Sequence, residues 1–150
     1  MNSTEELGVN ERFMEEALKE ASKALARNEV PIGAIVVISG KIVARAHNLT
    51  ETLSDPTAHA EMQAITAATA ALGGKYLPDA TIYVTVEPCP MCAAALYWAQ
   101  IGKLVYGAHD PKRGYTLVTQ NLLHPKTVVV KDVLGLKASQ LMKDFFRKKR

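Results

Sequence analysis

The chain has 150 residues, of which 48% are hydrophobic and 22% charged, with a formal net charge of +3. This length predicts one domain, residues 1–150, with a buried core, and so mild a charge does not by itself indicate nucleic acid binding. No apolar run approaches the roughly 20 residues that span a bilayer, and the N-terminus lacks signal-peptide features. We therefore expect a cytoplasmic protein without membrane contact, whose thiols stay reduced.

The first predicted elements are a helix and a hairpin. Apolar side chains at helical spacing predict a helix over residues 10–28, with Asn10 as its N-cap. Within residues 29–47, two β-branched runs flank Ser39-Gly40-Lys41, which predicts two strands joined by a tight turn.

A second helix is predicted over residues 55–74. Asp55 can cap it, Pro56 suits the first helical position, and Gly73-Gly74 would end it. Strands that alternate with helices predict a mixed or largely parallel sheet with helices on both faces, hence an α/β fold. The remaining predicted elements are a strand at 80–87, a helix at 88–100, strands at 103–108 and 126–130, and a helix at 138–150.

Both cysteines of the chain, Cys89 and Cys92, lie where a strand enters a helix. In a helical turn their sulfurs share a face and can reach one point, and the helix dipole lowers the pKa of thiols placed there. Two thiolates with His59 as a third ligand would leave the fourth position of a zinc ion to water, as in catalytic sites. A redox C-x-x-C pair and a structural zinc in a non-catalytic RNA-binding module are the alternatives.

Glu61 follows His59 by two residues, which on a helix turns the side chains about 200° apart and disfavours shared ligation. A glutamate in the first turn can instead reach what the metal holds, which indicates a general acid/base. His59-Ala60-Glu61 and Pro88-Cys89-Pro90-Met91-Cys92 together match the H-x-E…P-C-x-x-C signature of zinc nucleobase deaminases. Glu87, before this second motif, is expected to orient the cysteine loop.

Longer segments resemble the bacterial tRNA-specific adenosine deaminases of the cytidine/deoxycytidylate deaminase superfamily. The resemblance implies a three-layer cytidine-deaminase-like fold, with a five-stranded mixed sheet flanked by helices. It also implies a homodimer with one zinc ion (Zn2+) per chain, which binds a tRNA anticodon arm and converts the wobble adenosine to inosine. The similar segments are EVPIGAIVV (29–37), DPTAHAE (55–61), ATIYVTVEPCPMCAAAL (80–96), IGKLVYGAHDPKRG (101–114), LLHP (122–125) and DFFRKKR (144–150).

The resemblance assigns roles at the zinc site. It implies that His59, Cys89 and Cys92 bind the metal. Glu61 would move protons from the attacking water to the adenine ring and to the departing ammonia. Backbone amides around Ala60, at a helix N-terminus, would stabilise the anionic oxygen.

The resemblance also implies substrate contacts outside the zinc site. Asn48 matches a family position that hydrogen-bonds the flipped-out base, although by itself it indicates only a turn. Asp110 matches an acidic position beside the RNA, where a carboxylate can accept from a ribose 2′-OH; an Asp-Pro turn is the simpler explanation. His124 and Arg147 are expected to contact RNA, Arg147 through phosphate.

A guanine deaminase, or another deaminase of free nucleobases or nucleosides, is the nearest alternative function. EPCPMC followed by LYWA also resembles the bacterial guanine deaminases, which share the fold and the zinc site. EVPIGAI and FFRKKR favour the tRNA enzymes instead. YTLVTQNL (115–122) departs from the small residues expected in a loop beside the substrate.

Overall fold

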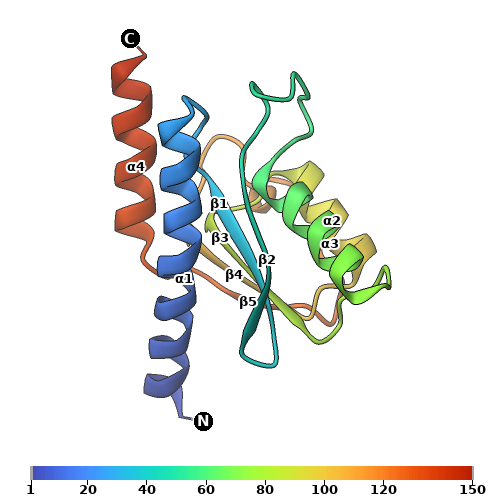
Figure 1. The fold of residues 1–150 in the computed structure, drawn as a ribbon. Helices are drawn as coiled ribbons and strands as arrows, with labels where there is room; N and C mark the ends of the chain where they lie inside the picture. Colours follow the sequence, from blue (N-terminus) through green and yellow to red (C-terminus); the bar gives the residue numbers. More distant parts are fainter. Residues whose placement is uncertain (1, 150) are drawn as a thin grey trace.

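The computed structural model describes residues 2–149; Met1 and Arg150, the last residue of the basic terminus, lie outside the described part. Five strands form one mixed sheet in the order β2-β1-β3-β4-β5, with helices on both faces (Figure 1). The expected α/β class and the five-stranded, three-layer fold are confirmed. The elements are α1 (Ser3–Ala26), β1 (Gly33–Ile38), β2 (Lys41–His47), α2 (Ala60–Leu72), β3 (Ala80–Val86), α3 (Pro90–Ala99), β4 (Lys103–Ala108), a 3-10 turn (Tyr115–Leu117), β5 (Val128–Val130) and α4 (Gly135–Lys148).

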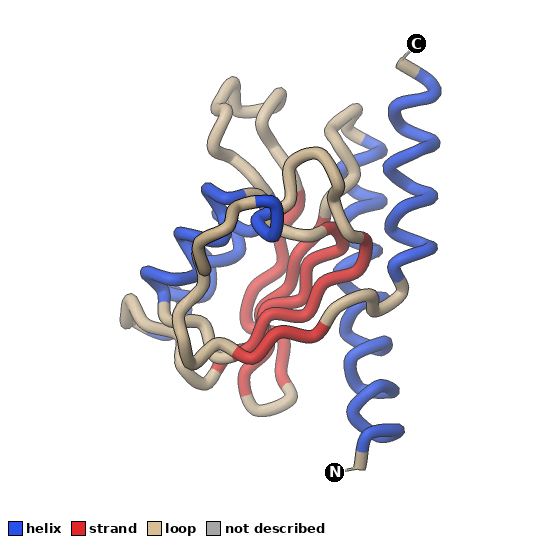
Figure 2. The backbone as a smooth tube through the Cα atoms, turned by 180° about the vertical axis from the view of Figure 1, so that it is seen from behind, coloured by secondary structure: helices blue, strands red, loops and turns tan. Residues whose placement is uncertain are grey.

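The sheet separates two apolar cores, one under α1 and α4 and the other under α2 and α3 (Figures 1 and 2). Alternate residues of β1 serve the two sides: Ala34 and Val36 pack toward α2 and α3, whereas Ile35 and Val37 pack toward α1 and α4. Because both faces are covered, the strand is an unbroken apolar run. Within residues 2–149, no helix combines the length and apolar character needed to cross a membrane.

The direction of the strands decides where the chemically active loops gather. β1 runs antiparallel to β2 and β3, whereas β3, β4 and β5 are parallel. The carboxyl ends of β2, β3 and β4 therefore meet at the edge where β1 begins. Ligand sites of α/β sheets lie at carboxyl ends of this kind, so the segments that follow His47, Val86 and Ala108 share one edge.

The first helix begins earlier than its apolar pattern predicted. Asn2, not Asn10, is the N-cap, and its Oδ1 accepts the backbone N–H of Glu5 at 2.9 Å. The added turns face solvent, so they carry no apolar periodicity for a sequence pattern to detect. Asn10 is instead buried inside the helix, where its Oδ1 accepts the Tyr83 hydroxyl at 3.1 Å.

The second helix begins later than predicted, at Ala60. Asp55 does not cap it, because its Oδ1 accepts the backbone N–H and the hydroxyl of Thr57, both at 2.8 Å, and forms a local turn. His59 takes the N-cap position instead. Gly73 ends the helix as predicted, with a left-handed φ of 71°. The other helices predicted at 88–100 and 138–150 differ only at their ends.

Candidate active site

Two helix starts bring three potential metal ligands together. His59 is the N-cap of α2 and Cys89 the N-cap of α3, while Cys92 lies in the first turn of α3. His59 Nδ1 lies 3.4 Å from the Cys92 sulfur and 3.6 Å from the Cys89 sulfur. The ligand atoms of all three residues lie within 4.8 Å of one another. This group, predicted from the sequence, can hold a metal ion.

The spacing and chemistry of this group fit zinc. In a tetrahedral site with Zn–S of about 2.3 Å and Zn–N of about 2.0 Å, a nitrogen and a sulfur ligand lie roughly 3.5 Å apart. The distances of 3.4 and 3.6 Å from the His59 nitrogen to the two sulfurs agree with that value. Thiolates and imidazole are zinc ligands, whereas Mg2+ and Ca2+ prefer oxygen.

The pKa values of the two thiols are shifted in opposite directions. A hydrogen bond from Cys92 lowers the pKa of Cys89 to about 4, against the effect of burial and with further help from His59. The same hydrogen bond, together with burial, raises the pKa of Cys92. One sulfur is therefore a thiolate at neutral pH, and binding of a metal by both would release the remaining proton.

Glu61 lies beside this group as the second residue of α2. Its side chain is buried, and burial raises its pKa to about 7, with the negative charge of Cys89 adding to the shift. A carboxyl that titrates near neutrality can both take up and return a proton. Because His59 is a cap with extended backbone (φ −71°, ψ 155°), helical phase does not set the angle between the two side chains, contrary to the expectation of about 200°.

Backbone amides complete the inner part of the site. Ala60 is the first residue of α2 and is fully buried. The first N–H groups of a helix have no partner within it and carry the positive end of its dipole. The starts of α2 and α3 thus direct two sets of amides toward the metal-binding group.

Glu87 holds the loop that follows β4. The residue is 3% exposed and its side chain is fully buried. One carboxylate oxygen accepts from the backbone N–H of Asp110 (3.1 Å) and lies 2.5 Å from Nδ1 of His109. The other accepts the backbone N–H (3.0 Å) and the hydroxyl (2.8 Å) of Thr116. The sequence predicted that Glu87 would orient the cysteine loop; its side chain is bonded instead to residues 109–116.

Replacing Glu87 with glutamine is expected to destabilise the fold by about 1.5–3 kcal/mol at neutral pH, because the carboxylate accepts charge-assisted bonds. Although burial raises the pKa of Glu87, hydrogen bonds from Thr116, Asp110 and His109 hold it below its ordinary value of 4.5. A lowered folded-state pKa contributes stability above pH 4.5 and loses it as the pH falls further. Urea unfolding should show the difference from wild type shrinking in acid; a difference constant with pH would contradict this account.

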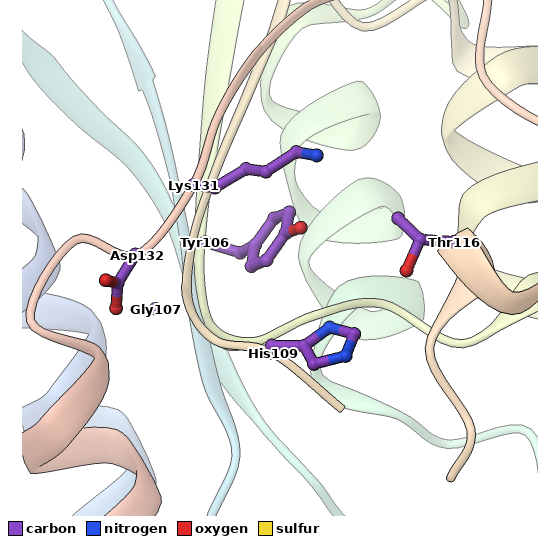
Figure 3. A pocket seen from close by; sticks show the side chains of 6 residues that line it. All are labelled: Tyr106, Gly107, His109, Thr116, Lys131 and Asp132. Atoms are coloured by element: carbon purple, nitrogen blue, oxygen red, sulfur yellow. The ribbon is translucent and has the colours of Figure 1, made fainter. Parts of the chain in front are cut away.

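A cavity of about 410 Å³ adjoins the loop that Glu87 holds. The side chains of Tyr106, His109, Thr116 and Lys131 face a common space in it (Figure 3). None of the metal-binding residues lines this cavity, which is also bordered by Gly107 and Asp132. The cavity is therefore distinct from the metal-binding group, and two of the residues that line it, His109 and Thr116, are in contact with Glu87.

The substrate residues expected from the resemblance occupy different surroundings. Asn48 follows β2 at the edge where the carboxyl ends of β2, β3 and β4 meet, called the active edge from here on, and it is 5% exposed. Asp110 follows β4 at the same edge, where its Oδ1 accepts the backbone N–H groups of Lys112 and Arg113, both at 3.0 Å. The simple turn therefore exists, and its backbone N–H groups engage the carboxyl group of Asp110.

His124 and Arg147 lie farther along the chain. The ring of His124 is 5.8 Å from that of Tyr97 on α3, and its Nδ1 accepts the backbone N–H of Lys126 at 3.1 Å. Arg147 forms an ion pair with Asp144 in α4, on the sheet face opposite α2 and α3 (Figure 1). The fold does not bring Arg147 to the metal-binding group.

Sequence reasoning missed Glu29, which is fully buried at the same edge of the sheet. It accepts hydrogen bonds from Asn48, Glu51 and Thr52. The signal was a charged residue directly before the apolar run VPIGAIVV. A carboxylate in that position is buried only if it is well bonded.

Comparisons with known proteins agree with this architecture. A family model described as MafB19-like deaminase matches residues 9–150. The tRNA-specific adenosine deaminase of Bacillus subtilis is 48% identical over 94% of this chain and 91% of its own length. A solved structure from work on A-to-I editing by tRNA deaminases at the wobble position is 44% identical, with a TM-score of 0.81 over 87% of this chain and 98% of its own. Guanine deaminase from Bacillus subtilis is 38% identical, with a TM-score of 0.63 over 73% of this chain and 66% of its own.

Proposed function

This chain belongs to the tRNA-specific adenosine deaminases, and on that premise we propose that it converts adenosine to inosine at the wobble position of a tRNA anticodon. The reaction is a hydrolysis, in which a C–O bond replaces the C6–N bond of adenine and ammonia leaves. The observation that carries the proposal is the His59, Cys89 and Cys92 group with buried Glu61 beside it. That arrangement is typical of zinc deaminases.

His59, Cys89 and Cys92 would hold one zinc ion, which supplies the Lewis acidity that makes water nucleophilic at neutral pH. Glu61 takes one proton from the attacking water and passes it to the ring, and then carries the second proton of that water to the leaving amino group. Its burial supports this role, because a carboxyl with a pKa of about 7 can act as base and then as acid. The amide of Ala60 stabilises the developing negative charge on oxygen.

Four residues outside the metal group are proposed to bind the tRNA. Asn48, at the active edge, hydrogen-bonds the flipped-out adenine. Asp110 accepts a ribose 2′-OH, a group that DNA lacks. His124 contacts the anticodon loop beside α3. Arg147, exposed at the end of α4, contacts a phosphate away from the target base.

We further propose that residues 1–150 are a single deaminase domain that works as a homodimer in the cytoplasm, where its tRNA substrate occurs. The side chains of Tyr97 and Trp98 on α3 are 40% and 75% exposed. Exposed aromatic residues are typical of protein interfaces, which supports a dimer contact there. A monomer in sedimentation equilibrium at micromolar concentration would contradict the dimer.

The function is tested with an anticodon stem-loop that carries adenosine at the wobble position. We expect inosine to form in the stem-loop, and no ammonia to be released from free guanine. The guanine assay is the matched control, because guanine deaminases share this fold. Ammonia from guanine without inosine would overturn the proposal and leave the metal group unaffected.

A further inference from the structure

Glu29 is a fully buried carboxylate whose side-chain bonds all go to one short segment, residues 48–52. One oxygen accepts from Asn48 Nδ2 (3.3 Å) and from the backbone N–H of Glu51 (3.1 Å). The other accepts the backbone N–H (2.7 Å) and the hydroxyl (2.6 Å) of Thr52. Glu29 therefore holds this segment through side-chain hydrogen bonds, as Glu87 holds the loop after β4.

The segment that Glu29 holds is joined to the metal-binding residues. The backbone N–H of Leu49 donates to the carbonyl of Ala58 at 2.9 Å, one residue before His59. The backbone N–H of Asn48 donates to the carbonyl of Ile32, the residue before β1, at 3.1 Å. Asn48 thus has a fixed backbone at the active edge, and only the orientation of its amide group remains to be set.

The charge of Glu29 sets that orientation. Burial alone would raise its pKa, but hydrogen bonds from Thr52 and Glu51 hold the pKa below its ordinary value of 4.5. A carboxylate can only accept hydrogen bonds, so the amide of Asn48 must turn its Nδ2 toward Glu29. The second N–H of Nδ2 reaches the hydroxyl of Thr50, also at 3.3 Å; it is the weaker of the two bonds because its acceptor is neutral, whereas the bond to the Glu29 carboxylate is charge-assisted.

The other end of the amide is left for a ligand. Within residues 2–149, no hydrogen bond is made to Oδ1 of Asn48. If this oxygen were fully buried it would be an unpaired buried polar atom, but the one such side-chain nitrogen or oxygen in these residues is His47 Nε2. Oδ1 therefore reaches the surface beside the weakly held second N–H. Together they present an acceptor next to a donor, the pattern with which an asparagine reads the N6 and N7 edge of adenine.

We propose that Glu29 is a positioning residue, which acts through Asn48 by locking its amide in the orientation that recognises the target adenine. This inference rests on the proposed function, because it takes the wobble adenine as the ligand of Asn48. Glutamine at position 29 would put an amide NH2 group, which is a donor, in place of the oxygen that accepts hydrogen bonds from Asn48 and Glu51. The Asn48 amide would then turn over to offer Oδ1 to it, and the pattern facing the substrate would be reversed.

A double-mutant cycle tests the proposal. We expect Glu29→Gln to lower kcat/KM on the stem-loop about tenfold to a hundredfold, as loss of an outer-shell partner does, with the zinc content unchanged. In the Asn48→Ala background the same substitution should cost less than about twofold, because the group on which Glu29 acts is gone. Thr52→Val, which removes a Glu29 bond but keeps the Asn48 contact, is the matched control and should stay within about threefold of wild type.

A second measurement does not depend on activity. In wild type, the side-chain amide protons of Asn48, assigned by their absence in Asn48→Ala, should exchange slowly with water, and in Glu29→Gln they should exchange faster. Equal losses of kcat/KM in both backgrounds, or equally fast exchange in wild type and Glu29→Gln, would overturn the positioning role. An inactive wild type with slow Asn48 exchange would contradict the proposed function and leave the orienting contact standing.

Discussion

Replacing Glu61 with glutamine is expected to slow inosine formation by about 10³–10⁴-fold, while the protein keeps its fold and its zinc. Glutamine has nearly the same shape but cannot take up a proton from the attacking water or deliver one to the ring and to the leaving amino group. The large effect follows because the other buried carboxyls at this edge, those of Glu29 and Glu87, accept hydrogen bonds from residues 48–52 and 109–116 instead.

The stability of the Glu61→Gln variant separates a catalytic role from a structural one. Burial raises the pKa of Glu61 to about 7, so the folded protein disfavours the charged form of this side chain. A neutral glutamine should leave the unfolding free energy unchanged or increase it. Lost activity with a lost fold would therefore contradict the assignment.

The measurement is single-turnover inosine formation, with zinc content and urea unfolding determined on the same samples. Glu6→Gln is the matched control, because Glu6 is exposed on α1, on the opposite face of the sheet. It should react at the wild-type rate. More than a tenth of the wild-type rate in Glu61→Gln would show that another group moves the proton.

The metal site could be predicted from the sequence because its signals are local. Cys89 and Cys92 are three residues apart in one turn, so their spacing indicates that the two sulfurs can converge. The spacing of His59 and Glu61 did not, because His59 is a cap with extended backbone. The H-x-E and P-C-x-x-C motifs were expected to form one site because each lies at the start of a helix, and His59 and Cys89 are indeed the N-caps of α2 and α3. The caps were predicted less well, since Asp55 satisfies its hydrogen bonds in a turn with Thr57 and leaves the cap to His59.

The supports of the site could not be predicted, because their partners are distant in the chain. Glu29 is bonded to residues 48–52, and Glu87 to residues 109–116. Each is a glutamate close to a buried strand. This pattern indicates that the buried carboxylate must accept hydrogen bonds, but it does not indicate which residues donate them. The order and direction of the strands explain the pairing, since together they place the start of β1 and the ends of β2, β3 and β4 at one edge.

Removing zinc is expected to abolish activity and to lower the stability of the fold, and one equivalent of zinc per chain should restore both. The metal would join the starts of α2 and α3, and a ligand that binds only the folded state stabilises it by mass action. At free zinc of about a thousand times Kd, this stabilisation amounts to about 4 kcal/mol. Chelation followed by metal titration, with urea unfolding and inosine formation measured at each step, tests both effects.

Cys92→Ser is the variant that distinguishes a zinc ligand from a redox thiol. Cys92 is completely buried and lies 3.4 Å from His59 Nδ1, so serine keeps the volume of the side chain but binds zinc poorly. The variant should have less than about a thousandth of the wild-type activity, as expected when a metal that activates water is lost. Its stability should no longer rise with added zinc. Wild-type activity that persists in fully chelated protein would show that the group formed with His59 holds no catalytic metal. Activity that follows added thiol reductant instead of zinc would show that the two cysteines do redox chemistry.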